Sequence, residues 1–384
     1  MQAANPRAQR AANRSLILSE LRSHRLASRV DLSRSTGLEK SSITNIVSDL
    51  LEAGLLAEQE RGRSATSGGR RAVSLRINER FCSFLGIEIQ PRRYRAALLD
   101  LTGAQIFRDQ GEVHAERDGL GATLQNVYQR LSPGVDRLRV PVAGLGIGVP
   151  GYVNPVTGAI SRSIPLGLEH VEFLPPPNPW GVQAWMENDA KCCAWAQLIE
   201  PAVGAPRNLL ALLMEFQEAN PILGQGAGVS TGFGVVIEDR VYYSNRFASG
   251  DFKSLFWRAG HKGQVGILDD RLATIRADEA VYASYLEEIL LHFSPLASVL
   301  DPDRIVLCGD AAPSTDRLHA MLQGPLAGTW ISQPDNARRI HVSRFGELGV
   351  AVGAAGRLLV SLFQPGPTPL VDWETLLAAR GAVR

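Results

Sequence analysis

A glycine turn between two amphipathic segments constrains this chain more than any other feature, and it lies within residues 28–56. Ser28 is suited to cap a first helix that carries Leu32, and Gly37 supplies a tight turn. Beyond the turn, apolar residues recur with the 3.6-residue period of one helix face, at Ile43, Ile46, Val47, Leu50 and Leu51. Gly54 is placed to end this second helix. The spacing predicts a helix-turn-helix.

The opposite face of the second helix carries small hydroxyl and amide side chains, which let a helix approach base edges and phosphates closely. Four of them are expected to face the major groove of DNA, namely Ser41, Ser42, Thr44 and Asn45. Asn45 suits a bidentate contact with adenine, because this helix has no arginine that would read guanine. The alternative is an ordinary surface helical hairpin that contacts no nucleic acid.

The segments on either side complete a winged helix-turn-helix. Residues 57–77 alternate around a Gly/Ser-rich tip, as a β-hairpin does, and this hairpin is the predicted wing. Four arginines at its tip are expected to reach phosphates or a minor groove: Arg61, Arg63, Arg70 and Arg71. Without the preceding helices, such a cluster would indicate only a solvated surface. Upstream, we expect a mobile arm over residues 1–12 and a first helix capped by Asn13, with Leu16, Ile17, Leu18 and Leu21 as its apolar residues.

Charge separates the two parts of the chain. Residues 1–80 hold 14 Arg or Lys against 8 Asp or Glu, whereas residues 81–384 hold 26 against 31. A basic head on an acidic body fits a DNA-binding module attached to a part that does not touch DNA. The four cysteines, Cys82, Cys192, Cys193 and Cys308, lack metal-ligand spacing. The sequence shows neither a signal peptide nor a membrane-length apolar run, so we expect a cytoplasmic protein without a membrane partner.

From Phe81 onward strands alternate with helices, which predicts an α/β body of two lobes with a cleft between them. Several glycine-rich and acidic motifs punctuate these strands: GIGVPG at 146–151, ENDA at 187–190, STGFG at 230–234, DPDRIVLCGD at 301–310 and GAAG at 353–356. In their order and spacing, and with the GGRR of residues 68–71, these motifs resemble the ROK family of repressors, open reading frames and kinases. The resemblance covers nearly the whole chain.

The resemblance implies a winged head and two actin-like, or RNase H-like, lobes with sugar and ATP bound in the cleft. It divides the chain into a DNA-binding domain at 1–80, a first lobe at 81–190 and a second lobe at 191–364, with a C-terminal helix at 365–384 returning to the first lobe. Asp189 stands where the family's catalytic aspartate stands. A helix N-cap before Ala190 is the structural alternative for this residue, and both roles can coexist.

The kinase motifs are altered. The family's first phosphate loop carries an aspartate and glycines, whereas this chain has Glu88, Gln90 and Pro91 at those positions. Proline removes a backbone donor, so we expect no working phosphate cradle and no ATP. Lys253 and Ser254 replace the family's Gly-His pair, and its cysteine cluster is missing. We therefore expect no zinc and no other metal or cofactor.

A sugar pocket is still expected, because Asp251 can replace the family's sugar-binding glutamate. The predicted ligand-binding residues are Gly151, Asn188, Asp189 and Asp251. The leading hypothesis is a sequence-specific transcriptional regulator of carbohydrate-metabolism genes. Its partners would be operator DNA, a sugar or sugar-phosphate effector that it does not phosphorylate, and further copies of itself in a homodimer or homotetramer. The alternative is a bifunctional ATP-dependent sugar kinase that also binds DNA, and a third possibility is a body that senses a partner protein.

Overall fold

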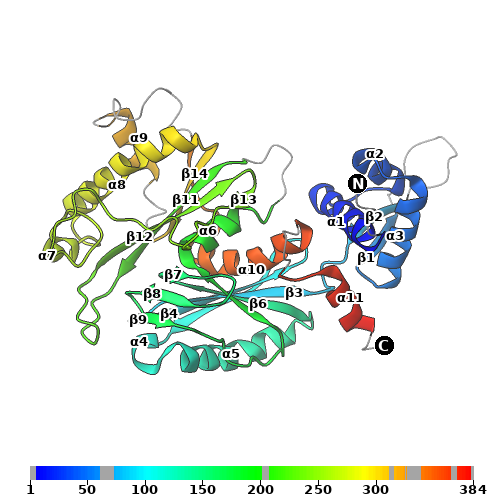
Figure 1. Cartoon of the computed structure of the whole chain (residues 1–384), viewed down its shortest axis with the longest axis horizontal. Coiled ribbons are helices and arrows are strands. Elements are labelled where there is room, and N and C mark those ends of the chain that lie inside the picture. Colours follow the sequence, from blue (N-terminus) through cyan, green and yellow to red (C-terminus); the bar gives the residue numbers. More distant parts are fainter. Residues whose placement is uncertain are drawn as a thin grey trace.

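The computed structural model describes residues 6–60, 73–200, 207–310, 315–324, 326, 339–364 and 370–381. These residues form a small head and a larger body with two five-stranded sheets (Figure 1). The described part of the head consists of α1 (Pro6–His24), α2 (Arg29–Thr36), α3 (Lys40–Glu52) and the antiparallel pair β1 (Leu56–Glu60) and β2 (Val73–Ile77). The order of these elements is that of a winged helix-turn-helix, as the sequence predicts.

Local chemistry fixes the helix-turn-helix. The Ser28 hydroxyl accepts a hydrogen bond from the Asp31 backbone N–H, and the Asp31 carboxylate accepts one from the Ser28 N–H at 3.0 Å. This reciprocal pair is a capping box that starts α2. Gly37 (φ 71°) and Gly54 (φ 77°) lie in the left-handed region after α2 and α3, where a side chain would be strained. The predicted cap and both predicted glycine turns are confirmed.

The start of α1 differs from the prediction. The helix begins at Pro6, so Asn13 lies inside it and is no cap, and residues 6–12 are helical rather than a mobile arm. Proline is favoured in the first turn of a helix because its fixed φ fits there and its missing N–H is not needed. The alanines, arginines and glutamine that follow are helix formers. Of the predicted apolar residues, Ile17, Leu18 and Leu21 are buried, but Leu16 is 41% exposed.

The first sheet of the body has the order β10-β6-β3-β4-β5. Its strands are β3 (Ser83–Ile89), β4 (Arg93–Asp100), β5 (Gln105–Glu112), β6 (Val142–Val149) and β10 (Ala184–Asn188). The first three are antiparallel, and β6 and β10 run parallel to β3. The short helix α4 (Ala115–Asp118) and the long helix α5 (Leu120–Arg137) follow β5, and α5 packs on one face of the sheet. A small three-stranded sheet follows β6: β7 (Tyr152–Val153), β8 (Ile160–Ser163) and β9 (Leu168–Val171).

The second sheet has the order β13-β12-β11-β14-β15. Its strands are β11 (Leu209–Gln217), β12 (Gly228–Ile237), β13 (Arg240–Val241), β14 (Arg304–Gly309) and β15 (Ile340–Val342). Alternate residues of β11 point to opposite faces: Leu210 and Leu212 share a core with α8 (Glu279–Leu300), whereas Leu209 and Leu213 share one with α6 (Asp189–Gln197). The shorter elements are α7 (Asp269–Leu272), α9 (Thr315–Gln323) and the 3-10 turn η3 (Gly346–Leu348).

Helix α10 (Gly349–Phe363) occupies the centre of the body between the two sheets (Figure 1). Glycines allow its backbone to approach its neighbours. A Cβ at Gly86 of β3 would overlap the α10 backbone at Ala351, and a Cβ at Gly353 of α10 would overlap the backbone of Cys192 on α6. The stretch Gly346–Phe363 is long and apolar enough to cross a membrane, but 78% of it is buried inside the protein, as a core helix would be.

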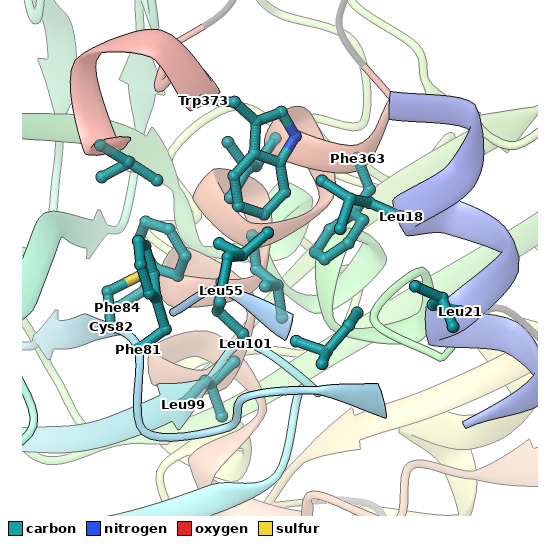
Figure 2. Packing of buried hydrophobic residues seen from close by; sticks show 14 of the residues in the cluster. Leu18, Leu21, Leu55, Phe81, Cys82, Phe84, Leu99, Leu101, Phe363 and Trp373 are labelled. Carbon is teal, nitrogen blue, oxygen red and sulfur yellow. The ribbon is translucent and has the colours of Figure 1, made fainter. Parts of the chain in front are cut away.

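The head and the body share one hydrophobic core. Leu18 and Leu21 of α1 belong to the same cluster as Phe84 of β3, Phe363 of α10 and Trp373 of α11 (Trp373–Gly381) (Figure 2). The Arg22 guanidinium lies 4.6 Å from the centre of the Phe363 ring. The same side chain donates a hydrogen bond to the Ile199 carbonyl. Because this core is continuous, the head is docked on the body and does not hang from a free linker.

The glycine packing of α10 predicts a large effect of one methyl group. We expect Gly353→Ala to lower the free energy of unfolding by about 2–3 kcal/mol, because the added Cβ meets backbone that cannot move aside. Gly121 of α5 is the matched control, since a Cβ there meets nothing within 4 Å. Gly121→Ala should raise the free energy of unfolding by about 0.5–1 kcal/mol. Urea unfolding followed by circular dichroism measures both, and equal effects would contradict the packing argument.

Candidate functional site

Helix α3 presents one buried and one exposed face. Ile43, Val47 and Leu50 are at most 1% exposed and fix the helix on the head. Ser41, Thr44 and Asn45 are exposed on the other face and Ser42 is half-buried. The Thr44 hydroxyl donates to the Lys40 carbonyl at 2.8 Å, so its methyl group is left for outside contacts. Arg61, Arg63, Arg70 and Arg71 lie outside the described residues.

A second group of polar residues gathers at the start of α6. Asn188 is the residue that caps this helix, because its side-chain oxygen accepts from the Lys191 N–H at 3.0 Å. The structural alternative considered for Asp189, a helix N-cap, therefore belongs to the preceding residue. The Asn188 amide also donates to the Gly151 carbonyl and to the Asp189 carboxylate, both at 2.9 Å. These three predicted ligand-binding residues thus lie together.

Asp189 is the most perturbed carboxyl of this group. Its side chain accepts from the Ala190 N–H at 2.8 Å and the residue is 8% exposed. Burial is the largest cause that raises the pKa of Asp189, the charge of Glu88 also raises it, and the net value is about 7. The Gln90 amide and the Ala190 N–H oppose this rise by hydrogen-bonding the carboxylate. The carboxyl therefore keeps its proton to a higher pH than an ordinary aspartate does.

Asp251 is tied to the same group from the second lobe. The Tyr152 hydroxyl donates to its carboxylate, and its backbone pairs with Gly232 on β12. The Lys191 ammonium donates to the carbonyls of Phe247 at 3.2 Å and Ser249 at 2.9 Å, which holds the loop before Asp251 against α6. Sequence reasoning missed Tyr152 and Lys191. Their positions beside the GIGVPG and ENDA motifs were the available signal.

The segment around Gln90, where the resemblance places a phosphate loop, is a tight β-hairpin between β3 and β4. The Gln90 N–H donates to the Arg93 carbonyl at 2.9 Å, and the Gln90 amide donates to the Glu88 carboxylate at 3.2 Å. Glu88 is fully buried and pairs with Arg95 at 3.4 Å. Arginine side chains and their carboxylate partners therefore occupy the space around this turn.

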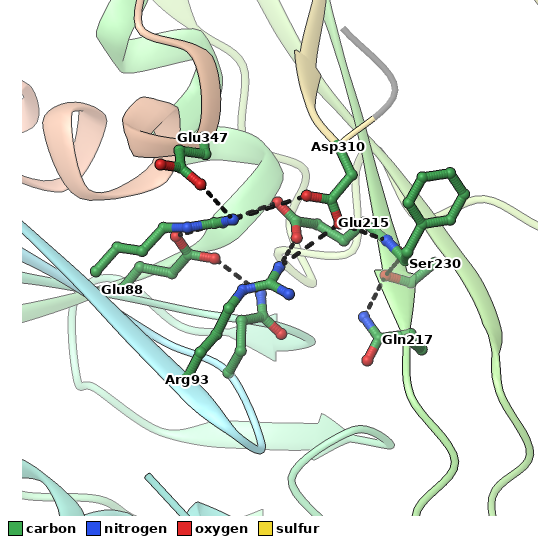
Figure 3. A network of polar contacts seen from close by, with 10 residues as sticks. Glu88, Arg93, Glu215, Gln217, Ser230, Asp310 and Glu347 are labelled. Carbon is green, nitrogen blue, oxygen red and sulfur yellow. Dashed lines mark hydrogen bonds and ion pairs between the residues drawn. The ribbon is translucent and has the colours of Figure 1, made fainter. Parts of the chain in front are cut away.

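These arginines join the two sheets (Figure 3). Arg93 of β4 forms an ion pair with Glu215 of β11 and lies 3.9 Å from the Asp310 carboxylate. Arg95 reaches Glu215 at 3.5 Å, Asp310 at 3.7 Å and Glu347 at 3.4 Å. Asp310 is held in place by the Phe216 N–H, which donates to it at 2.8 Å. We call Arg93, Arg95, Glu88, Glu215, Asp310 and Glu347 the arginine cluster.

The segment around Lys253 and Ser254, where we expect no zinc, is held by a hydrogen bond and by a cation–π contact. The Leu255 N–H donates to the imidazole of His292 at 2.8 Å, and the Lys253 ammonium lies 3.2 Å from the centre of the Trp257 ring. Within the described ranges, no group of three or more His, Cys, Asp or Glu side chains is arranged to hold a metal ion. All four cysteines are buried and none forms a disulfide.

A groove of about 470 Å³ lies where the head meets the body. It is lined by the end of α1, by both wing strands and by Thr102 and Glu200 of the body. Arg22 lines it as well, and burial lowers the pKa of this guanidinium to about 10.

Curated relatives match the chain in its sequence, although no family model matches it. It is 22% identical over 233 residues to the xylose repressor of Caldicellulosiruptor bescii, a match that covers 60% of this chain and 55% of the relative. It is 27% identical over 239 residues to the xylose repressor of Bacillus subtilis, covering 60% and 56%. It is 24% identical over 220 residues to the DNA-binding transcriptional repressor Mlc of Escherichia coli, covering 55% and 52%. The chain thus spans about half the length of the curated relatives it matches.

Solved structures extend the likeness to the whole fold. A ROK family transcriptional regulator, a homologue of the E. coli Mlc protein, superposes with a TM-score of 0.68 at 18% identity, over 98% of this chain and 100% of that one. A ROK family glucokinase from Streptomyces griseus, in complex with glucose and AMPPNP, superposes with a TM-score of 0.52 at 14% identity, over 71% and 98%.

The fold is therefore a winged helix-turn-helix joined to a two-lobed, actin-like body, and the predicted fold class is confirmed. Within that class, the chain is similar in sequence to transcriptional repressors and in fold to a ROK family transcriptional regulator, in agreement with the resemblance that the motifs indicate.

The raised pKa of Asp189 predicts how stability depends on pH. A carboxyl whose pKa is higher in the folded than in the unfolded chain binds its proton more tightly when folded, so its stabilising effect is lost as pH rises towards 7. We expect the free energy of unfolding to fall by about 2 kcal/mol between pH 5 and pH 7 through this group. Asp189→Asn should remove this fall, whereas the control Asp239→Asn, at an exposed turn, should keep it. Urea unfolding at each pH tests this, and an unchanged slope in Asp189→Asn would contradict it.

Proposed function

We propose that the protein is a sequence-specific transcriptional regulator of carbohydrate-metabolism genes whose kinase-derived body senses a sugar without phosphorylating it. The observation that carries this proposal is the exposed polar face of α3, held in place by the capping box at Ser28 and the glycine turn at Gly37. A helix so presented can enter a major groove. The repressor names of the relatives support the same reading. Acting on DNA, the protein would work in the cytoplasm.

In this proposal the body signals to the head through α6 and α10. The ligand residues Asn188 and Asp189 start α6, whose backbone at Cys192 lies directly against Gly353 of α10. At the other end of α10, the Ser19 hydroxyl of the head donates to the Phe363 carbonyl at 3.1 Å. A shift of α6 on ligand binding would thus reach the head through packed elements. A coupling free energy of about 1–3 kcal/mol is typical of such switches.

The protein would bind DNA as a homodimer or as a homotetramer made of such dimers. Two heads related by a two-fold axis read a palindromic operator, so a change in the lobe angle of each body would alter the spacing of the heads. The four wing arginines would add affinity that does not depend on sequence.

The alternative is a bifunctional kinase, and the pKa of Asp189 is the observation that favours it, because a general base works best with a pKa near the working pH. Against it stands the arginine cluster, which fills the turn where phosphate would have to be held. A sensor explains both observations, since Asp189 can bind a sugar hydroxyl without transferring a phosphoryl group.

Operator binding tests the first half of the proposal. We expect Asn45→Ala to weaken binding of the full chain to its own upstream DNA by about tenfold or more, through loss of a base contact worth about 1–3 kcal/mol. Fluorescence anisotropy against a scrambled duplex measures this effect. The matched control is Asn126→Ala, an exposed asparagine on α5 of the body, which should change nothing. Equal affinity of native protein for both duplexes would refute the regulator.

A turnover assay tests the second half. We expect no ADP release from ATP and magnesium with any sugar of a panel, in the native protein and in Asp189→Asn alike, because the turn at Gln90 offers no phosphate cradle. Sugar-dependent ADP release that is lost in Asp189→Asn would establish the kinase and reject the sensor. An authentic sugar kinase in the same assay shows that turnover would be detected.

A further inference from the structure

The arginine cluster is electrostatically complete without a ligand. Its two guanidinium groups, on Arg93 and Arg95, face the carboxylates of Glu88, Glu215, Asp310 and Glu347 at distances of up to 3.9 Å. Arg276 adds one more positive charge nearby, since it lies over the Phe216 ring and lowers the pKa of Arg93. Four carboxylates therefore stand against three guanidinium groups. No uncompensated positive charge is left in this cluster to attract an anion.

Removing the ion-pair partners of the two central carboxylates would be strongly unfavourable. Glu88 is 0% exposed and Glu215 is 1% exposed. A phosphate that captured Arg93 or Arg95 would leave these carboxylates charged and unpaired in the protein interior. Breaking a buried ion pair by removing one partner is strongly destabilising, because the remaining charge is neither solvated nor compensated.

The cluster is also continuous with the predicted ligand-binding residues. Glu88 is hydrogen-bonded to Gln90, and Gln90 in turn hydrogen-bonds the Asp189 carboxylate. Asp251 adds a further carboxylate near Lys191, where it accepts from the Tyr152 hydroxyl. A phosphate group on a sugar held by Asn188 and Asp189 would therefore lie near the carboxylates of Asp189 and Asp251, whereas the Lys191 ammonium already donates to the carbonyls of Phe247 and Ser249.

From this arrangement we infer that the group of Asn188, Asp189 and Asp251 accepts an uncharged sugar and rejects the phosphate ester of the same sugar. Carboxylate and amide oxygens accept hydrogen bonds from sugar hydroxyls, which carry no charge to be repelled. The arginine cluster takes the place of a bound phosphate and holds β4 against β11 across the two lobes. This inference rests on the proposed function, and it narrows the effector from a sugar or sugar phosphate to an uncharged sugar.

Isothermal titration of the full chain with matched pairs tests the inference. The probes are xylose, glucose and N-acetylglucosamine, each with its own phosphate ester: xylose 5-phosphate, glucose 6-phosphate and N-acetylglucosamine 6-phosphate. We expect at least one free sugar to bind, and any ester of it to bind about tenfold more weakly or worse, a difference of about 1.4 kcal/mol. An ester that binds as tightly as its free sugar, or a panel in which no free sugar binds, would overturn the inference.

Two substitutions test whether the arginine cluster causes the preference for a free sugar over its phosphate ester. Glu347→Gln removes a half-exposed carboxylate beside Arg95 without disturbing the core, and Glu215→Gln removes a buried one. Both should improve binding of the ester and of inorganic phosphate relative to the free sugar. The matched control Asp239→Asn removes one charge from the exposed Arg207 pair and should leave the ratio unchanged. An unchanged ratio in Glu347→Gln, which is the variant expected to fold normally, would count against the cluster as the cause.

The inference and the proposed function can fail separately. Anisotropy on the upstream DNA, run on the same samples, reports the regulator. Specific DNA binding with an ester as the tightest ligand would reject the inference and leave the regulator standing. If the protein binds DNA without specificity but still prefers the free sugar to its ester, the proposed regulator is rejected and the inference on ligand charge stands.

Discussion

The close packing of α10 is the constraint on which the remaining structure depends. Glycines at positions 86, 146 and 353 remove the side chains that would hold α10 away from β3, β6 and α6. A single helix can therefore pack against the first sheet, against α6 and against the head at once. Since interiors packed this closely transmit small displacements instead of absorbing them, the same contacts that stabilise the body also connect Asp189 to α1.

Local signals in the sequence were sufficient for the head and for most elements of the body. Ser28, Gly37 and Gly54 act through their own backbone neighbours, so their roles can be predicted without tertiary information. The alternation of strands and helices gave the α/β class for the same reason. The start of α1 was misplaced, because Asn13 is a good cap in isolation and only the proline at position 6 shows that the helix begins earlier.

The candidate site was predicted less completely, because its contacts join distant segments. The motifs located Gly151, Asn188 and Asp189, and the structure brings them into hydrogen-bond contact. The partners of Arg93 and Arg95 lie more than a hundred residues away, at Glu215, Asp310 and Glu347. No spacing rule connects such residues. The sequence could show that Glu88, Gln90 and Pro91 stand where the resemblance places a glycine loop, but not that two arginines and four carboxylates meet there.

Under the proposed function, the arginine cluster and Asp189 together account for a kinase-like fold that serves as a sensor. A kinase must hold a polyanion between its lobes, and that anion provides part of the energy that closes them. Here Arg93 and Arg95 join β4 to β11 through ion pairs with Glu215, which are contacts within the protein. In the proposed function the ligand binds instead at the group of Asn188, Asp189 and Asp251. A ligand there can shift the lobes only by the difference in its affinity for their two arrangements. Helix α6 starts at this group and packs on α10, which contacts the head. In the proposed function, even a small difference in ligand affinity between the two arrangements would therefore change the position of the head.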